Sequence, residues 1–112
     1  MGDFEGKAVL VTGAAGGIGR AAAVQFSQQG ASVVVADIDE EGLARTVEMA
    51  GDSVTSVLGD VANEASCQAM VDATVAQTGR LDVLFSNAGI SGNRAKLADI
   101  TTEDWFRVLN ID

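Results

Sequence analysis

Apolar residues gather in four short runs along the chain, and a helix-like segment richer in polar residues follows each run. The first two runs are continuously apolar, which is typical of strands buried on both faces of a parallel sheet. The third run mixes apolar and polar positions, and the fourth ends at a turn of small residues. The pattern therefore predicts four strands, at residues 7–12, 32–36, 53–58 and 81–85.

Helices are predicted between and after these strands, because capping residues begin the segments and glycines end the first three of them. Asp39, Asn63 and Thr101 are the expected N-terminal caps. The predicted helices cover residues 17–29, 40–50, 64–78 and 102–110, with a loop over 90–100.

The regular alternation of strand and helix over short connections predicts an α/β fold. We expect a Rossmann-like, doubly wound parallel sheet of about four strands in the order 3-2-1-4, with the fourth strand at an unpaired edge. Residues 1–112 form one predicted domain. Its last helix runs to the chain end without a C-terminal cap, so we expect this domain to be incomplete.

The composition is that of a globular protein, with 47% apolar and 21% charged residues. Seven basic and 16 acidic side chains give a formal charge of −9, which disfavours nucleic acid and anionic membrane surfaces as partners. The single cysteine, Cys67, excludes an internal disulfide and a multi-cysteine metal site, and no metal is expected. Without an apolar run of membrane-spanning length or a secretory signal, we expect a cytoplasmic protein.

The clearest candidate for chemistry is a glycine-rich turn between the first strand and the first helix. Gly13 would allow a sharp turn after the strand, and Gly17 would let a pyrophosphate approach the backbone. Gly19 would let the helix pack closely without an intervening side chain. Because the surface is acidic, backbone N–H groups at the helix N-terminus must carry any anion. A tight connection without a ligand is the alternative.

An acidic residue stands about 20 residues after this turn, where a dinucleotide site needs an acceptor for ribose hydroxyls. Asp37 ends the second strand, and Ile38, rather than a basic residue, follows it. A carboxylate here would repel a 2′-phosphate, which favours NAD over NADP. The alternative is that Asp37 belongs only to a polar turn before the next helix.

Two further motifs follow the third and fourth strands, at the edge where a parallel sheet binds ligands. Asp60 and Val61 would face the crevice, where the carboxylate would accept from an adenine amino group. Asn87, Ala88 and Gly89 would leave room for a flat ligand, and the Asn87 amide would link neighbouring strands. Ordinary strand-ending turns explain each motif equally well when it is taken alone.

As a set, these features resemble the short-chain dehydrogenase/reductase family in its NAD-preferring form. The features are Thr12-Gly13-x-x-x-Gly17-x-Gly19, Asp37, Asp60-Val61, Asn87-Ala88-Gly89 and Asn110. The resemblance implies an oxidoreductase that passes hydride between an alcohol or carbonyl substrate and NAD, in a homo-oligomeric parent protein. It implies a cofactor pocket assembled from Gly13, Gly17, Ile18, Gly19, Asp37, Ile38, Asp60, Val61, Asn87, Ala88 and Gly89.

The resemblance also places Asn110 in the catalytic set, where its backbone helps to hold a proton-relay water. The family's catalytic Ser, Tyr and Lys lie downstream of these motifs, and this chain contains neither Tyr nor His. We therefore expect the 112 residues to be inactive alone. Two alternatives are a non-catalytic NAD-binding or interaction module and a short product that folds poorly.

Overall fold

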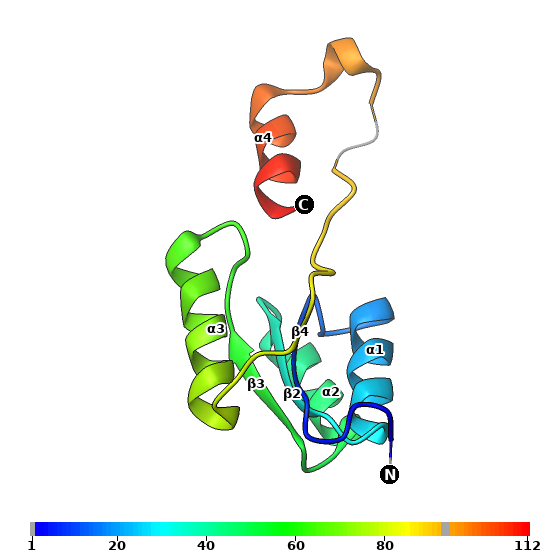
Figure 1. The fold of residues 1–112 in the computed structure, drawn as a ribbon. Helices are drawn as coiled ribbons and strands as arrows, with labels where there is room; N and C mark the ends of the chain where they lie inside the picture. Colours follow the sequence, from blue (N-terminus) through cyan, green and yellow to red (C-terminus); the bar gives the residue numbers. More distant parts are fainter. Residues whose placement is uncertain (1, 93–94) are drawn as a thin grey trace.

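The computed structural model describes residues 2–92 and 95–112 and shows an α/β arrangement (Figure 1). Residues 93–94 of the predicted loop lie outside the described residues. The elements, in chain order, are β1 (Ala8–Thr12), α1 (Gly17–Gln28), β2 (Ser32–Asp37), α2 (Glu40–Ala50), β3 (Val54–Leu58), α3 (Glu64–Thr78), β4 (Val83–Phe85), the short 3-10 helix η1 (Leu97–Asp99) and α4 (Thr102–Ile111).

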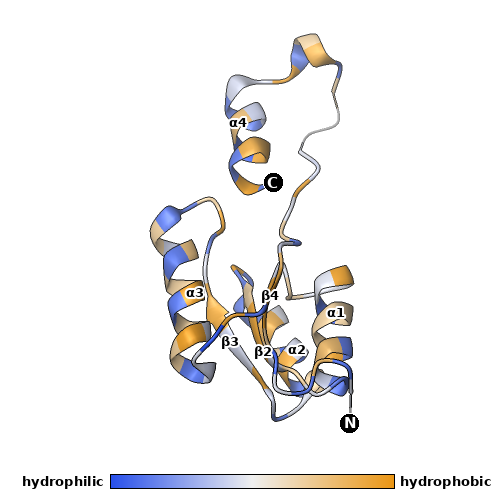
Figure 2. Cartoon of the chain, viewed as in Figure 1, coloured by the Kyte–Doolittle hydropathy of each residue, from blue (hydrophilic) through white to orange (hydrophobic). Residues whose placement is uncertain are grey.

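The four strands form one parallel sheet in the order β3-β2-β1-β4, which confirms the predicted topology. All five residues of β1 are buried, because β2 and β4 pair with it on its two sides. β4 lies at the edge, as predicted, and Leu84 at its centre is 55% exposed. Burial is therefore greatest on the central strands β1 and β2, whereas the equally apolar residues of β4 are only partly buried or exposed (Figure 2).

The two faces of the sheet build separate halves of the core, since successive side chains of a strand point to opposite faces. Val9, Val11, Val33 and Val35 pack with residues of α1 and α2 on one face. Leu10, Val34 and Ala36 pack with Met70 of α3 on the other. This three-layer arrangement leaves the carboxyl ends of the strands open toward α4, which lies beyond them (Figure 1).

The predicted helix starts are confirmed at all three capped positions. The side chains of Asp39, Asn63 and Thr101 each accept a hydrogen bond from a backbone N–H three residues on. Such caps satisfy one of the four backbone N–H groups that a helix N-terminus leaves without a partner, and typically contribute about 1 kcal/mol. Local sequence therefore determines where these helices begin.

β4 is shorter than predicted, and the reason lies in Asp82. A carboxylate oxygen of Asp82 accepts the Ala8 N–H at 2.8 Å, while the Asp82 N–H donates to the Ala8 carbonyl at 2.9 Å. The side chain thus replaces a backbone acceptor at the start of the ladder. The regular strand begins one residue later, at Val83.

Candidate functional site

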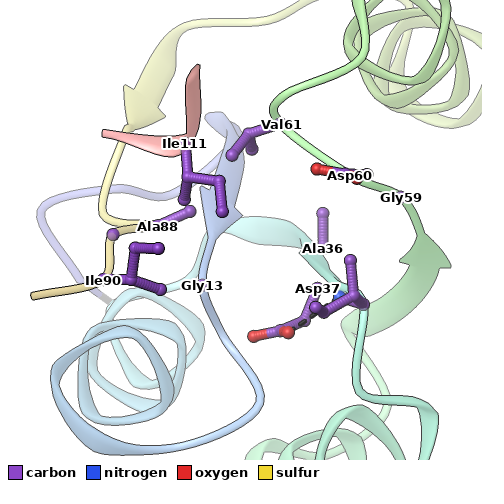
Figure 3. A pocket seen from close by; sticks show the side chains of 11 residues that line it. Gly13, Ala36, Asp37, Gly59, Asp60, Val61, Ala88, Ile90 and Ile111 are labelled. Carbon is purple, nitrogen blue, oxygen red and sulfur yellow. Dashed lines mark hydrogen bonds between the residues drawn. The ribbon is translucent and has the colours of Figure 1, made fainter. Parts of the chain in front are cut away.

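A crevice opens over the carboxyl ends of the strands. Its walls come from the segments that follow all four strands and from the end of α4 (Figure 3). Eleven residues line it: Gly13, Ala36, Asp37, Ile38, Gly59, Asp60, Val61, Ala88, Gly89, Ile90 and Ile111.

The glycine turn leaves β1 through two backbone conformations that favour glycine. Gly13 has a φ of 65° and Gly17 a φ of 55°, both in the left-handed region. Gly19 serves a different purpose, because an ideal Cβ there would overlap the Gly13 carbonyl oxygen and lie 2.8 Å from Nδ2 of Asn87. Only glycine at position 19 lets α1 approach the turn this closely.

The N-terminus of α1 presents backbone N–H groups that no side chain caps. Gly16 is the N-cap residue, and the first turn contains no acidic side chain. The helices α2, α3 and α4 differ, since each has both a side-chain cap and an acidic residue in its first turn. The partial positive charge of α1 is therefore available to an external anion.

Asp37 places a carboxylate beside the glycine turn, as Figure 3 shows. One of its oxygens accepts from the Ala15 N–H at 3.0 Å, and the other accepts from Ile38 and Asp39 at 2.7 and 3.1 Å. Each carboxylate oxygen has two lone-pair positions, so the oxygen that bonds to Ala15 has capacity for another donor. Asp37 is thus a positioned acceptor at the rim of the crevice.

The segment after β4 is tied to the segment after β1. The Thr12 hydroxyl accepts from the backbone N–H groups of Asn87 and Ala88 at 3.0 and 3.2 Å. The side-chain amide of Asn87 donates to the Gly13 carbonyl at 3.3 Å, which is the link between neighbouring strands that we predicted. These bonds hold the small residues Ala88 and Gly89 at the crevice wall.

Apolar side chains form the other walls of the crevice. In Figure 3, Val61 and Ile111 point toward each other across the opening, and Ile90 lies on the wall near Ala88. The Asp60 carboxylate accepts the Ala62 N–H at 2.9 Å, which fixes the turn after β3. Ile38 and Ile18 flank the glycine turn and are 74% and 72% exposed, so neither is committed to the core.

The structure brings together seven of the eleven predicted cofactor residues as lining of this crevice: Gly13, Asp37, Ile38, Asp60, Val61, Ala88 and Gly89. The other four predicted residues do not line the crevice. Three of them, Gly17, Ile18 and Gly19, begin α1, and the fourth, Asn87, bonds to Gly13 through its side-chain amide. Asn110 lines a neighbouring cavity, together with Thr12 and Ser86, that shares Val61 and Ile111 with the crevice.

Sequence reasoning missed Ala36, Gly59, Ile90 and Ile111. The first three adjoin predicted cofactor-binding residues, so extending each of those motifs by one position would have found them. Ile111 also follows a predicted residue, Asn110, but its place in the crevice depends on how α4 returns to the sheet. The crevice therefore combines carboxylates and apolar side chains, and the uncapped start of α1 follows the turn that begins at its lining residue Gly13.

Within residues 2–92 and 95–112, no helix is long and apolar enough to cross a membrane. The same described residues contain no group of three or more histidine, cysteine or acidic side chains arranged to hold a metal ion.

The chain matches the sequence pattern of a known protein family and is similar to several known proteins. A sequence model of the short chain dehydrogenase family matches residues 7–112. The chain is 45% identical over 109 residues to momilactone A synthase of Oryza sativa subsp. japonica, covering 96% of this chain and 40% of the relative. It is 44% identical over 111 residues to secoisolariciresinol dehydrogenase of Forsythia intermedia, covering 97% of this chain and 40% of that protein.

A solved short chain dehydrogenase/reductase from Burkholderia phymatum in complex with NAD superposes with a TM-score of 0.92 at 40% identity, covering 99% of this chain and 40% of that one. The 3-ketoacyl-(acyl-carrier-protein) reductase of Brucella melitensis, complexed with NADH, gives a TM-score of 0.93 at 34% identity over 97% of this chain and 45% of that one. The chain thus spans less than half the length of these similar proteins.

Proposed function

This chain belongs to the short-chain dehydrogenase family, and we propose that it is the NAD-binding part of an oxidoreductase. The observation that carries the proposal is the arrangement at this edge of the sheet. Asp37 lines the crevice and bonds to the glycine turn, which starts at the lining residue Gly13 and leads into the uncapped N-terminus of α1. For the whole protein we propose hydride transfer between a small alcohol or carbonyl substrate and the nicotinamide of NAD.

The residues present fit an anionic dinucleotide on electrostatic grounds. A pyrophosphate needs donors, and the start of α1 offers N–H groups with the positive end of the helix dipole. Gly13 and Gly17 have positive φ angles and no side chains of their own, so neither adds a side chain where the backbone would meet a pyrophosphate. Arg20, the nearest basic residue in sequence, directs its guanidinium to backbone carbonyls of Ala15 and Gly42.

Asp37 supports NAD rather than NADP as the cofactor. Its carboxylate is held by three backbone N–H groups and would accept hydrogen bonds from ribose hydroxyls. A 2′-phosphate at the same place would face a fixed negative charge, and the exposed side chain beside Asp37 is the uncharged Ile38. The two solved relatives described above, which hold NAD and NADH, agree with this assignment.

When bound, NAD supplies an acceptor or donor of hydride at its nicotinamide ring. This chain's residues would bind and orient it: Asp60 and Val61 beside the adenine, and Ala88 and Gly89 along the wall. We propose a catalytic role for Asn110, on the last turn of α4, from its match to the family pattern. The chain contains no Tyr, so we assign proton transfer to none of these 112 residues.

Calorimetric titration of the full chain with NAD and with NADP tests the proposal. We expect binding of NAD and weaker binding of NADP, and we expect Asp37→Ala to weaken NAD binding and to reduce the difference. Asp39→Ala is the matched control, since it also removes one charge, from the α2 cap. Failure to bind NAD, or equal affinity of the unaltered chain for both cofactors, would contradict it. Binding without turnover would favour a non-catalytic NAD-binding chain instead.

A further inference from the structure

A polar cluster outside the crevice fastens the glycine turn to α2. The Arg20 guanidinium donates to the carbonyls of Ala15 and Gly42, to the latter at 3.1 Å, and through Nε to the Thr46 hydroxyl at 2.9 Å. The Thr46 hydroxyl donates to the Ala14 carbonyl at 2.6 Å. We call these two side chains and three carbonyls the guanidinium clasp.

The clasp lies at a close approach between two elements. Thr46 is fully buried. Gly42 touches the turn so closely that an ideal Cβ there would lie 2.6 Å from Cβ of Ala15. A cation in the first turn of α1 opposes the helix dipole. The hydrogen bonds from Arg20 to the carbonyls of Ala15 and Gly42 therefore explain why a positively charged side chain stands at this position.

Holding a carbonyl also directs the next N–H group. A trans peptide is planar, so its C=O and N–H point in opposite directions. Because Thr46 holds the Ala14 carbonyl on the α2 side, the Ala15 N–H points the other way and reaches Asp37 at 3.0 Å. Because Arg20 holds the Ala15 carbonyl, the Gly16 N–H likewise points away from α2.

The opposite side of the turn is fixed as well, by the Ala14 N–H, which donates to the Ala36 carbonyl at 3.2 Å. Residues 14 and 15 are thus held by β2 through their N–H groups and by the clasp through their carbonyls. Releasing the carbonyls would leave the Ala15 peptide free to rotate, and Asp37 would lose the bond that fixes one of its oxygens.

We propose that Arg20 and Thr46 are positioning residues for cofactor selection: the guanidinium clasp aims the Ala15 N–H at Asp37 and so fixes the carboxylate that distinguishes NAD from NADP. The inference rests on the proposed function, and neither residue lines the crevice. The role of Arg20 is geometric, through its fork of donors, and not through attraction of the cofactor's negative charge.

The test measures the ratio of the dissociation constants for NADP and NAD in the full chain. This ratio is insensitive to the fraction of folded protein, because loss of folded molecules weakens both affinities equally. We expect Arg20→Gln and Thr46→Val each to lower the ratio by roughly five- to tenfold, since each loosens a hydrogen bond to a charged group. Thr46→Ser keeps the hydroxyl, so its ratio should remain close to that of the unaltered chain.

Arg45→Gln is the matched control. Arg45 is exposed and lies next to Thr46 on α2, and its replacement changes the net charge as much as Arg20→Gln does. It should leave the ratio unchanged. If Arg20 acted by charge, Arg20→Gln would weaken NADP more than NAD and raise the ratio, while Thr46→Val would not alter it. Either that pattern or a parallel loss of both affinities would overturn the proposal.

Hydrogen exchange of the Ala15 amide without cofactor separates this inference from the proposed function. We expect faster exchange in Thr46→Val and Arg20→Gln than in the unaltered chain, and protection retained in Thr46→Ser. Unchanged protection in both variants would refute the clasp even if NAD binds. If the Ala15 amide loses protection in both variants but the unaltered chain binds no NAD, the clasp is supported and only the cofactor assignment is contradicted.

Discussion

Gly19→Ala should destabilise the fold, because the added methyl group would collide with atoms that cannot move cheaply. The Cβ would overlap the Gly13 carbonyl oxygen and lie 2.8 Å from Nδ2 of Asn87. Carbon–oxygen contacts normally begin near 3.3 Å, so α1 and the turn would have to separate by roughly 1 Å. Overpacking of this kind costs about 1–3 kcal/mol.

Separation would also break the hydrogen bond from the Asn87 amide to the Gly13 carbonyl, at a cost of about 1 kcal/mol. The better helix propensity of alanine offsets about 1 kcal/mol of this. We therefore expect a net loss of about 2 kcal/mol, which corresponds to a fall in Tm of roughly 10 °C for a chain of this size.

Urea denaturation followed by circular dichroism measures the loss directly. Gly16→Ala is the control, because nothing lies within 4 Å of a Cβ at that position and its φ of −178° is ordinary extended backbone. It should lose no more than about 1 kcal/mol, the preference for glycine over alanine at an N-cap. If Gly19→Ala is as stable as Gly16→Ala, the close packing of α1 on the turn is wrong.

Two further substitutions test the hydrogen bonds of Thr12 and the contribution of the Asp82 carboxylate to stability. Thr12→Val should lower stability by about 1–3 kcal/mol in the same urea assay, because the N–H groups of Asn87 and Ala88 lose their acceptor, while Thr12→Ser should keep most of it. The Arg80 guanidinium, followed by the Ala8 N–H, holds the pKa of the Asp82 carboxyl below its ordinary value. The stability that ionised Asp82 contributes is therefore present above the unfolded-state pKa and is lost as the pH falls through the folded-state pKa. The difference in urea midpoint between Asp82→Asn and the unaltered chain should be largest near neutral pH and shrink as the pH falls through the acidic range in which the Asp82 carboxyl is protonated; a constant difference would contradict this.

The sheet could be predicted because its determinants are local. A continuous apolar run such as Val33, Val34 and Val35 is explained only by burial on both faces, and the structure buries all three residues. The caps at Asp39 and Asn63 are equally local, since each side chain bonds to an N–H three residues away. Together with the short connections, these signals were sufficient for the strands, the helices and a parallel sheet, whereas the strand order was taken from the Rossmann-like fold.

The parts that could not be predicted depend on contacts between distant residues. Arg20 meets Thr46 across 26 positions, and no periodic pattern relates a guanidinium to the carbonyls it will hold. Ile111 reaches the crevice only because α4 returns toward the sheet, where Asp112 accepts the Ile90 N–H at 2.7 Å. Sequence reasoning therefore identified most of the crevice lining, including Asp37 and Val61, but missed Ile111 and the contacts of Arg20 and Thr46 that hold the glycine turn.

If NAD occupies the crevice over the carboxyl ends of the strands, its binding should change the amide chemical shifts of the residues there, which titration of the isotope-labelled chain measures. On titration with NAD, we predict that the largest shifts fall on Gly13, Gly17, Asp37, Asp60 and Gly89, with small shifts along the outer face of α3. A titration that leaves the start of α1 and the Asp37 amide unmoved, or that shifts residues elsewhere instead, would contradict the account.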